Sequence, residues 1–292
     1  MSRSVGRLCL IAACAAASAY AEAPAKATAD KVTSRIQLLR ASPGSGNVTM
    51  FIAEDDLLIV DSGRPEDAVQ VAARIASLSP KPIRYLVNTH YHDDHTGGNV
   101  AVARGGTIVA AEGCQKTMRK KLKPEQKPGD AGVPREIYGT ERGLRLGKQM
   151  VKLLHFGPGH TSGDTIVVFE GEKVIAAGDL FFNGLPPYID VADGSDTGNW
   201  VRMIRGLAER YPKYKVIPGH GPVTNMKVWL RFADYLTALR EKVAAAIEAG
   251  QTREQAISSV KLDEFPELKD VGEFLTKAQN VGWVYDELKR VN

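Results

Sequence analysis

The sequence has few cysteines, and most of them lie near its start. Its 292 residues include three, Cys9, Cys14 and Cys114, and the first two fall in an N-terminal stretch that we expect to be removed. A single remaining cysteine cannot form a disulfide bond within the chain. We therefore expect a fold that depends on its hydrophobic core. A chain of 292 residues with 43% hydrophobic side chains can build a large one.

The sequence also lacks a strong charge excess and long apolar runs. Lysine and arginine number 38 against 34 aspartates and glutamates, a formal net charge of +4. Removal of Arg3 and Arg7 leaves 36 − 34 = +2, which is too small to indicate a nucleic-acid partner. No segment approaches the roughly eighteen apolar residues that a transmembrane helix needs. The composition therefore predicts neither nucleic-acid binding nor a membrane span, and we expect a small-molecule partner.

The N-terminus has the pattern of a secretory signal. Arg3 and Arg7 give it a positive start, Leu8–Ala17 is apolar, and Ala19-Tyr20-Ala21 fits the small-x-small cleavage rule. This pattern predicts a signal peptide over residues 1–21 and a periplasmic or secreted protein. A minor alternative is a lipoprotein modified at Cys14, because Ile11–Cys14 resembles a bacterial lipoprotein box.

The rest of the chain alternates between strand-like and helix-like segments. Residues 22–35 are rich in alanine and are expected to form a linker. Short β-type runs then alternate with amphipathic helices, which predicts a mixed α/β (α+β) domain over 36–225. From Met226 the pattern is helical throughout. Residues 226–292 are therefore expected to form a C-terminal helical extension packed on that domain.

Histidines are concentrated in a pattern that indicates a metal site. Five of the six lie in three short segments: His90–His95 (HYHDDH) after a predicted strand, Pro158-Gly159-His160, and Pro218-Gly219-His220. Between the last two, Asp179 follows another strand. Loops at strand ends can bring distant residues together on a rigid scaffold. Imidazole and carboxylate ligands together suit zinc, iron or manganese.

These motifs, together with Asp61, resemble the metallo-β-lactamase fold superfamily of metal-dependent hydrolases. The resemblance runs from about Gln37 to Val223. It implies a four-layer αββα sandwich, in which two mixed β-sheets pack face to face between helices and the metals lie at one sheet edge. It also implies two divalent metal ions, with zinc expected first and iron or manganese as alternatives.

The resemblance assigns a role to each motif residue. His90, His92 and His160 would hold the first metal, and Asp94, His95 and His220 the second. Asp179 would bridge the two metals, and Asp61 would support the ligands without binding a metal. His155, beside the second motif, is either a similar supporting residue or an ordinary polar residue at a strand end.

The implied reaction is hydrolysis by a metal-bridging hydroxide. Two metals would lower the pKa of a bridging water toward roughly 7. Asp94 would orient the hydroxide and carry its proton. The bond opened would belong to a lactam, lactone, thioester or similar ester, and the net positive site would favour an anionic substrate. Phe181, Phe182 and Tyr188 are candidates for a pocket wall, although core packing would explain them as well.

Two residues depart from the thiolate-type zinc β-lactamases. Asp179 stands where those enzymes have cysteine, and Phe182 where they often have a basic residue. The aspartate resembles glyoxalase II, so β-lactam hydrolysis stays an open expectation. The other functional readings are an iron-dependent oxidoreductase on this scaffold and a non-catalytic periplasmic metal-binding protein. The basic run Lys116–Lys127 forms either a solvated face or a lid that steers anions.

Overall fold

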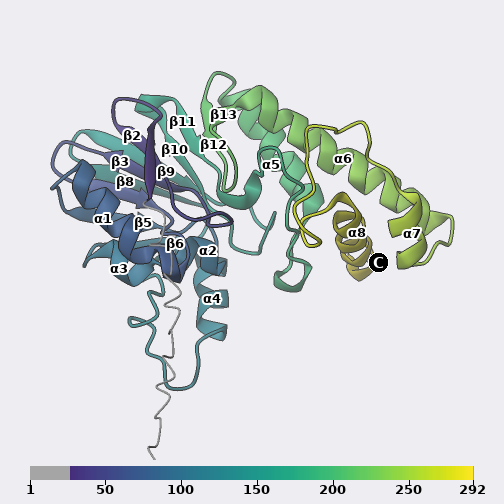
Figure 1. Cartoon of the computed structure of the whole chain (residues 1–292), viewed down its shortest axis with the longest axis horizontal. Helices are drawn as coiled ribbons and strands as arrows, with labels where there is room; N and C mark the ends of the chain where they lie inside the picture. Colours follow the sequence, from purple (N-terminus) through teal and green to yellow (C-terminus); the bar gives the residue numbers. More distant parts are fainter. Residues whose placement is uncertain (1–26, 292) are drawn as a thin grey trace, which may run out of the picture.

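The structure, a computed structural model, describes residues 27–291. The predicted signal peptide, Cys14 and the first part of the predicted linker lie outside the described residues. The described chain forms two β-sheets that pack face to face, with helices on both outer sides (Figure 1). The αββα sandwich predicted from the sequence is confirmed.

The first sheet has seven strands in sequence order. Neighbours from β1 to β4 run antiparallel, and neighbours from β4 to β7 run parallel. The strands are β1 (Thr28–Lys31), β2 (Ile36–Arg40), β3 (Val48–Ile52), β4 (Leu57–Val60), β5 (Ile83–Val87), β6 (Thr107–Ala111) and β7 (Glu136–Tyr138).

Strand β1 corrects the prediction of a linker over residues 22–35. Thr28–Lys31 pairs antiparallel with β2, and the flanking Ala27 and Val32 are buried. Most side chains of the strand itself are exposed, so it shows no row of buried apolar residues. It is held by backbone pairing to a sheet edge, which leaves little trace in the hydrophobic pattern.

The second sheet has six strands in the order β13-β12-β11-β10-β9-β8. All neighbours are antiparallel except β11 and β12, which are parallel. The strands are β8 (Glu141–Leu146), β9 (Gln149–Leu154), β10 (Ile166–Phe169), β11 (Val174–Ala176), β12 (Lys215–Ile217) and β13 (Thr224–Asn225).

The α-helices lie outside the two sheets (Figure 1). They are α1 (Ala68–Leu78), α2 (Asp93–Thr96), α3 (Asn99–Ala103), α4 (Glu112–Lys120), α5 (Thr197–Arg210), α6 (Met226–Glu248), α7 (Arg253–Ser259) and α8 (Lys277–Val291). No described helix combines the length and the apolar character that crossing a bilayer would require.

The core has three layers of apolar contact, as β4 illustrates. Leu58 and Val60 face the space between the sheets, whereas Leu57 and Ile59 face α1 and α3. A strand that is covered on both faces reads as a continuous apolar run, which is the pattern of β4. On the far side, the second sheet packs against α5 and α6.

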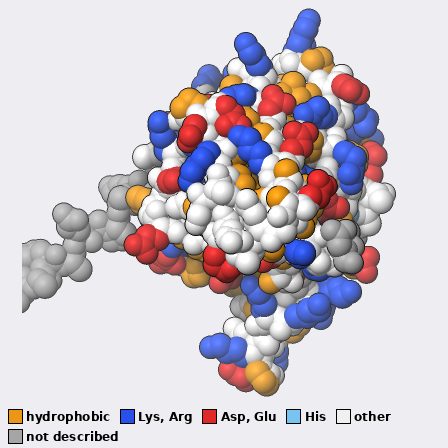
Figure 2. Space-filling view, turned by 90° about the vertical axis from the view of Figure 1, so that its right-hand side faces the viewer, with side chains coloured by type: hydrophobic (Ala, Val, Ile, Leu, Met, Phe, Trp, Pro, Cys, Tyr) orange, Lys and Arg blue, Asp and Glu red, His pale blue; other side chains and the backbone are white. Residues whose placement is uncertain are grey.

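The C-terminal helices are tied to the loops around the end of the second sheet. Glu287 on α8 is buried and accepts hydrogen bonds from the Thr197 backbone N–H (3.1 Å) and hydroxyl (2.7 Å) at the start of α5. Arg240 on α6 donates to the same carboxylate at 2.7 Å. The Asn280 side chain donates to the Pro187 carbonyl at 2.7 Å. On the outer face of the C-terminal helices, acidic and basic side chains are interspersed (Figure 2).

Candidate metal centre

The first histidine loop follows β5 and is fixed by its own backbone. The His92 carbonyl accepts hydrogen bonds from the backbone N–H groups of His95 (3.0 Å) and Thr96 (2.9 Å), which makes α2 a single turn. The side chains of Asn88 and Asn99 pair with each other at 2.8 and 2.9 Å beneath the loop. The turn directs the donor atoms of the loop to one side.

One group of donor atoms comes from three loops. His90 Nε2 lies 3.0 Å from His92 Nδ1, and His160 Nε2 lies 3.1 Å from the same atom. Asp179 Oδ2 completes the group, 3.5 Å from His160 Nε2 and 3.7 Å from His90 Nε2. His90, His160 and Asp179 are buried, and His92 is partly exposed.

A second group lies on the other side of Asp179. Asp179 Oδ1 is 3.1 Å from His95 Nε2 and 3.5 Å from His220 Nε2. Asp94 Oδ2 is 3.2 Å from His220 Nε2. The structure thus brings together all seven residues that the sequence singled out as ligands, and the Asp179 carboxylate lies between the two groups.

Hydrogen bonds on the far side of each ring set which nitrogen faces inward. The Tyr188 carbonyl, which can only accept, is 2.8 Å from His160 Nδ1. The Thr89 hydroxyl donates to Asp61, so its oxygen accepts from His90 Nδ1 at 3.0 Å. In each ring Nδ1 carries the hydrogen, and the lone pair of Nε2 points into the group.

Asp61 fixes His95 in the same way. Its Oδ2 lies 2.8 Å from His95 Nδ1, and its Oδ1 accepts from the Thr89 backbone N–H at 2.8 Å. The Asp61 backbone has a φ of 62°, in the left-handed region that few non-glycine residues adopt. This conformation costs of order 1–3 kcal/mol and persists only where the surroundings enforce it. The structure places Asp61 behind the donor groups, as the resemblance implies.

Asp190 is a site residue that the sequence analysis missed. Its Oδ2 is 3.0 Å from His92 Nε2 and also accepts from the Tyr91 hydroxyl. His92 therefore carries its hydrogen on Nε2 and turns Nδ1 toward the first group. Asp190 is 98 residues from His92 and belongs to none of the histidine motifs. No sequence signal marked it.

The donor atoms have the chemistry of a cation site. Lone pairs of His90, His92 and His160 converge at 3.0–3.1 Å, where they repel one another unless a cation lies among them. Asp179 Oδ1 and His95 Nε2 are buried without a hydrogen-bond partner among the described residues. Leaving such atoms unsatisfied costs about 1–3 kcal/mol each. Nitrogen and carboxylate donors in this arrangement fit divalent metal ions such as zinc.

The two groups differ in their electrostatics. In the first, burial lowers the pKa of His160 to about 4, and burial with the neighbouring His95 lowers the pKa of His90 well below its usual value. In the second, burial opposes a charge on His220, yet Asp179 and Asp94 raise its pKa to about 9. His90 and His160 therefore present neutral imidazoles, whereas the second group creates a negative field that favours a positive charge.

Glycines allow the donor loops to approach one another closely. A Cβ on Gly219 would overlap Asp179 Oδ1 and lie 2.7 Å from the Gly178 carbonyl carbon. A Cβ on Gly46 would lie 2.5 Å from His95 Cε1.

Two tryptophans stabilise the turn that carries Asp179. The indole N–H groups of Trp200 (2.8 Å) and Trp229 (3.0 Å) both donate to the Leu180 carbonyl.

A cavity of about 600 Å³ opens onto the donor groups. His92, Asp94, Asp179 and His220 line its floor, while Phe182 and Tyr188 form part of its wall. The Phe182 ring stacks on His220 with centroids 5.2 Å apart.

The structure excludes Phe181 from the cavity wall, contrary to the prediction. Its ring is buried in the core against Trp229 and Phe232. The backbone at Phe181 is extended, with φ −148° and ψ 121°. Successive side chains of an extended segment point to opposite faces, so Phe182 faces the cavity and Phe181 cannot.

His155 lies outside the donor groups and supports them indirectly. Its Nδ1 is 2.7 Å from the Asp164 carbonyl. The Asp164 carboxylate accepts from the backbone N–H groups of Gly159 (3.0 Å) and Thr161 (2.9 Å), on either side of His160. His155 thus acts on the loop that carries His160, and its described contacts include no ligand residue.

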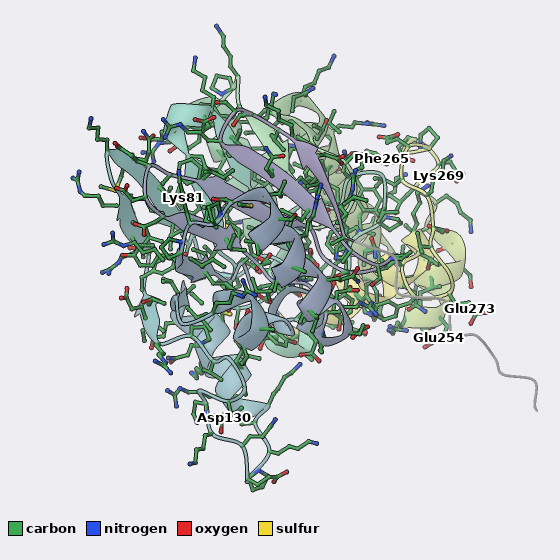
Figure 3. The ribbon with its side chains drawn as sticks, turned by 60° about the vertical axis from the view of Figure 1, so that its left-hand side comes forward. Lys81, Asp130, Glu254, Phe265, Lys269 and Glu273 are labelled. Atoms are coloured by element: carbon green, nitrogen blue, oxygen red, sulfur yellow. The ribbon has the colours of Figure 1, made fainter. Side chains whose placement is uncertain are left out.

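The basic run Lys116–Lys127 spans the end of α4 and the loop that follows it. This loop projects below the sandwich and includes Asp130 (Figure 3). Lysines and arginines predominate on the projection (Figure 2). Of this run, Lys121 lines the cavity.

Comparison with known proteins gives a consistent result. The model of the metallo-beta-lactamase superfamily matches residues 41–220. A hydroxyacylglutathione hydrolase from Anaeromyxobacter dehalogenans is 32% identical over 183 residues, which cover 61% of this chain and 62% of that protein. A metallo-beta-lactamase type 2 from a Bacillus species is 25% identical over 157 residues, which cover 53% of this chain and 58% of that protein. The chain thus spans about three fifths of these relatives.

Solved structures show the same fold. A metallo-beta-lactamase from Pontibacter korlensis has a TM-score of 0.63 at 23% identity, covering 73% of this chain and 99% of that one. The sec-alkylsulfatase Pisa1 from a Pseudomonas species has a TM-score of 0.72 at 17% identity, covering 89% of this chain and 50% of that one. With the family model matched over residues 41–220 and the donor groups lying within that span, the chain belongs to the metallo-β-lactamase superfamily.

Proposed function

We propose that the protein is an exported, dinuclear metal-dependent hydrolase that opens a lactam, lactone, thioester or similar ester bond. The observation that carries this proposal is the position of Asp179, whose two carboxylate oxygens face two separate donor groups. The proposal of export depends only on the sequence of residues 1–21.

The metals would be held by residues that are already oriented for the task. His90, His92 and His160 would hold one ion, Asp94, His95 and His220 the other, and Asp179 both. When bound, two divalent ions, for which we propose zinc ahead of iron or manganese, supply Lewis acidity and a water of lowered pKa. The ring orientations set by Asp61, Thr89, Asp190 and Tyr188 keep the inward nitrogens free to bind.

Asp94 is the residue placed to handle the proton. Its side chain is 23% exposed at the cavity floor, with Oδ2 held 3.2 Å from His220 Nε2. As water attacks the carbonyl carbon, the bond to the leaving group breaks and the proton of the water must reach that group. A carboxylate at the floor of the cavity can orient the water and carry this proton.

The choice of bond rests on the ligand set and on the relatives. An aspartate at position 179 and the absence of a basic residue at 182 favour thioester, ester and lactone bonds over β-lactams. A relative named hydroxyacylglutathione hydrolase supports this order, and relatives named metallo-beta-lactamase keep β-lactams in the panel of substrates to be tested.

Metal analysis combined with a substrate panel tests the proposal. Protein purified without chelators and supplied with zinc, manganese and iron is expected to retain two divalent ions per chain. It should hydrolyse at least one of a set of chromogenic lactams, lactones, thioesters and sulfate esters. Asp94→Ala should lower kcat by about 10²–10³-fold at an unchanged melting temperature.

Three results would contradict this proposal: no bound metal, one iron per chain with oxidation of a substrate, or near wild-type turnover by Asp94→Ala.

A second prediction concerns Asp190. Asp190→Asn is expected to weaken metal binding at the first donor group by about 10–100-fold, because His92 loses the carboxylate that fixes its ring. Competition with a chromogenic chelator measures the affinity of each ion. Asp130→Asn is the matched control, because Asp130 is exposed on the projecting loop, and it should leave both affinities unchanged (Figure 3). Equal affinities in the two variants would show that Asp190 does not orient His92.

A further inference from the structure

Two chemically different sets of side chains line the cavity above the donor groups. One set, the apolar wall, consists of Leu185, Val271, Phe274 and Leu275 in addition to Phe182 and Tyr188. The other set, the cationic wall, consists of Arg40, Arg64 and Lys121, and Arg64 contacts the loop of residues 42–45 through the Gly44 carbonyl. Asp93 is the acidic lining residue outside the donor groups.

The apolar wall depends on a short turn before α8. The Val271 N–H donates to the Leu275 carbonyl at 2.9 Å, and the Leu275 N–H donates to the Val271 carbonyl at 3.2 Å. Gly272, between them, has a φ of +58°. The turn lies on the C-terminal side of the molecule, where Glu273 marks it in Figure 3. It leaves Phe274 58% exposed and Val271 49% exposed. Large apolar side chains gathered at a cavity indicate a surface that a ligand covers.

A series of rings connects this turn with the donor groups. The Phe274 ring lies 5.2 Å from Tyr188 and 5.5 Å from Trp283, between ring centroids. Tyr188 in turn lies 5.4 Å from the His92 ring. An apolar group on the turn would therefore lie beside rings that extend to His92.

Two of the three cations are available to a ligand. Arg40 is paired with Asp30. Lys121 Nζ lies 4.1 Å over the Tyr91 ring and has no carboxylate within ion-pair distance among residues 27–291. Arg64 donates to the Gly44 carbonyl at 3.2 Å, and its acidic neighbour is the exposed Glu66 at 3.6 Å. Exposed pairs of this kind contribute little, so an anion can replace them.

We propose that the cavity binds a small anionic amphiphile, with its apolar group on the 271–275 turn and its anionic group near Arg64 and Lys121. A volume of about 600 Å³ suits a ligand of this size. That the susceptible bond lies over the donor groups rests on the proposed hydrolase function, whereas the binding of the amphiphile does not.

Binding of straight-chain carboxylates to the metal-loaded protein tests the proposal without any turnover. Trp283 reports on the site, because Trp200 and Trp229 are fully buried whereas Trp283 contacts Phe274. Each buried CH₂ tightens binding about fourfold, equal to about 0.8 kcal/mol. If only two of the four additional CH₂ groups are covered, octanoate should bind about 16-fold more tightly than butanoate.

Two sets of variants examine the two walls separately. Phe274→Ala combined with Val271→Ser should reduce the octanoate-to-butanoate ratio to about threefold or less. Phe156→Ala is the control, since Phe156 is also exposed (45%) but lies outside this cavity. Arg64→Ala combined with Lys121→Ala should weaken octanoate by about tenfold and leave the binding of octan-1-ol unchanged. Melting temperatures confirm that each variant folds.

The proposal is overturned by an unchanged ratio in the turn variant, by an altered ratio in Phe156→Ala, or by unchanged octanoate affinity in the cation variant. Its failure is separable from that of the hydrolase proposal. A protein that binds octanoate as expected but hydrolyses nothing contradicts only the proposed reaction. A protein that hydrolyses esters without regard to chain length or charge contradicts only the two-walled site.

Discussion

Replacing Asp179 with asparagine is expected to lower kcat/KM by about 10⁴-fold or more and to remove metal from both donor groups. The carboxylate faces His90 and His160 through Oδ2, and His95 and His220 through Oδ1. Burial alone would raise the pKa of Asp179, but charge on His95 and His220 holds it well below its usual value. Loss of this negative charge removes the ligand shared by both sites, and metals supply several kcal/mol of transition-state stabilisation.

Metal content by atomic emission and kcat/KM for the best substrate of the panel measure the two effects. Asp234→Asn is the control, since Asp234 lies on the surface in a weak pair with Arg205. It should behave as wild type. Two tightly bound ions in Asp179→Asn would show that the carboxylate is not a shared ligand.

Gly219→Ala is expected to lower activity by about 10³-fold and the free energy of unfolding by about 1–3 kcal/mol. The new Cβ would overlap Asp179 Oδ1 and lie 2.8 Å from the Asp179 backbone nitrogen. Because the obstruction is largely backbone, rotation of one side chain cannot relieve it. The Gly219 N–H also donates to the Gly178 carbonyl at 2.7 Å, so a shift would separate the two loops that carry Asp179 and His220.

Gly206→Ala provides the matched glycine control. Gly206 lies within α5, and a Cβ added there would meet no neighbouring side chain or loop within 4 Å. Alanine there should raise the free energy of unfolding by about 0.5–1 kcal/mol and leave the metal content unchanged. Chemical denaturation and metal analysis of both variants decide the matter. Full metal occupancy in Gly219→Ala would mean that the loops adapt more easily than their packing indicates.

The convergence of the seven donor residues could be predicted from sequence because its signal is local, whereas their roles as metal ligands stay a prediction from the resemblance. Glycine or proline adjoins His160 and His220, Gly97 follows the His90–His95 motif after one residue, and Asp179 follows a strand-like run. Loops at the ends of neighbouring strands meet at one edge of a sheet, so these residue types in this order already imply convergence. The fold was predicted from the resemblance of these motifs to the metallo-β-lactamase superfamily. The family match over residues 41–220 lies within the span from Gln37 to Val223 that the sequence indicated.

Other features depend on contacts that leave no local pattern. Asp190 reaches His92 across 98 residues, and β1 pairs through its backbone alone. Phe181 and Phe182 are adjacent and chemically identical, and only the direction of the extended backbone separates core from cavity. The 271–275 turn has no helical or strand periodicity, so its place in the cavity wall follows only from the packing of the C-terminal extension.

The attachment of α8 affects the order in which the site is completed during synthesis. Residues 187–197, which include the supports of His92 and His160, are tied to α8 through Asn280, Glu287 and Arg290. A nascent chain can form the His90–His95 loop long before this last described helix has left the ribosome. In that chain Asp61 and Thr89 would already hold the rings of His95 and His90, whereas His92 and His160 would lack their supports. Tight metal binding at the first donor group should therefore coincide with the docking of α8.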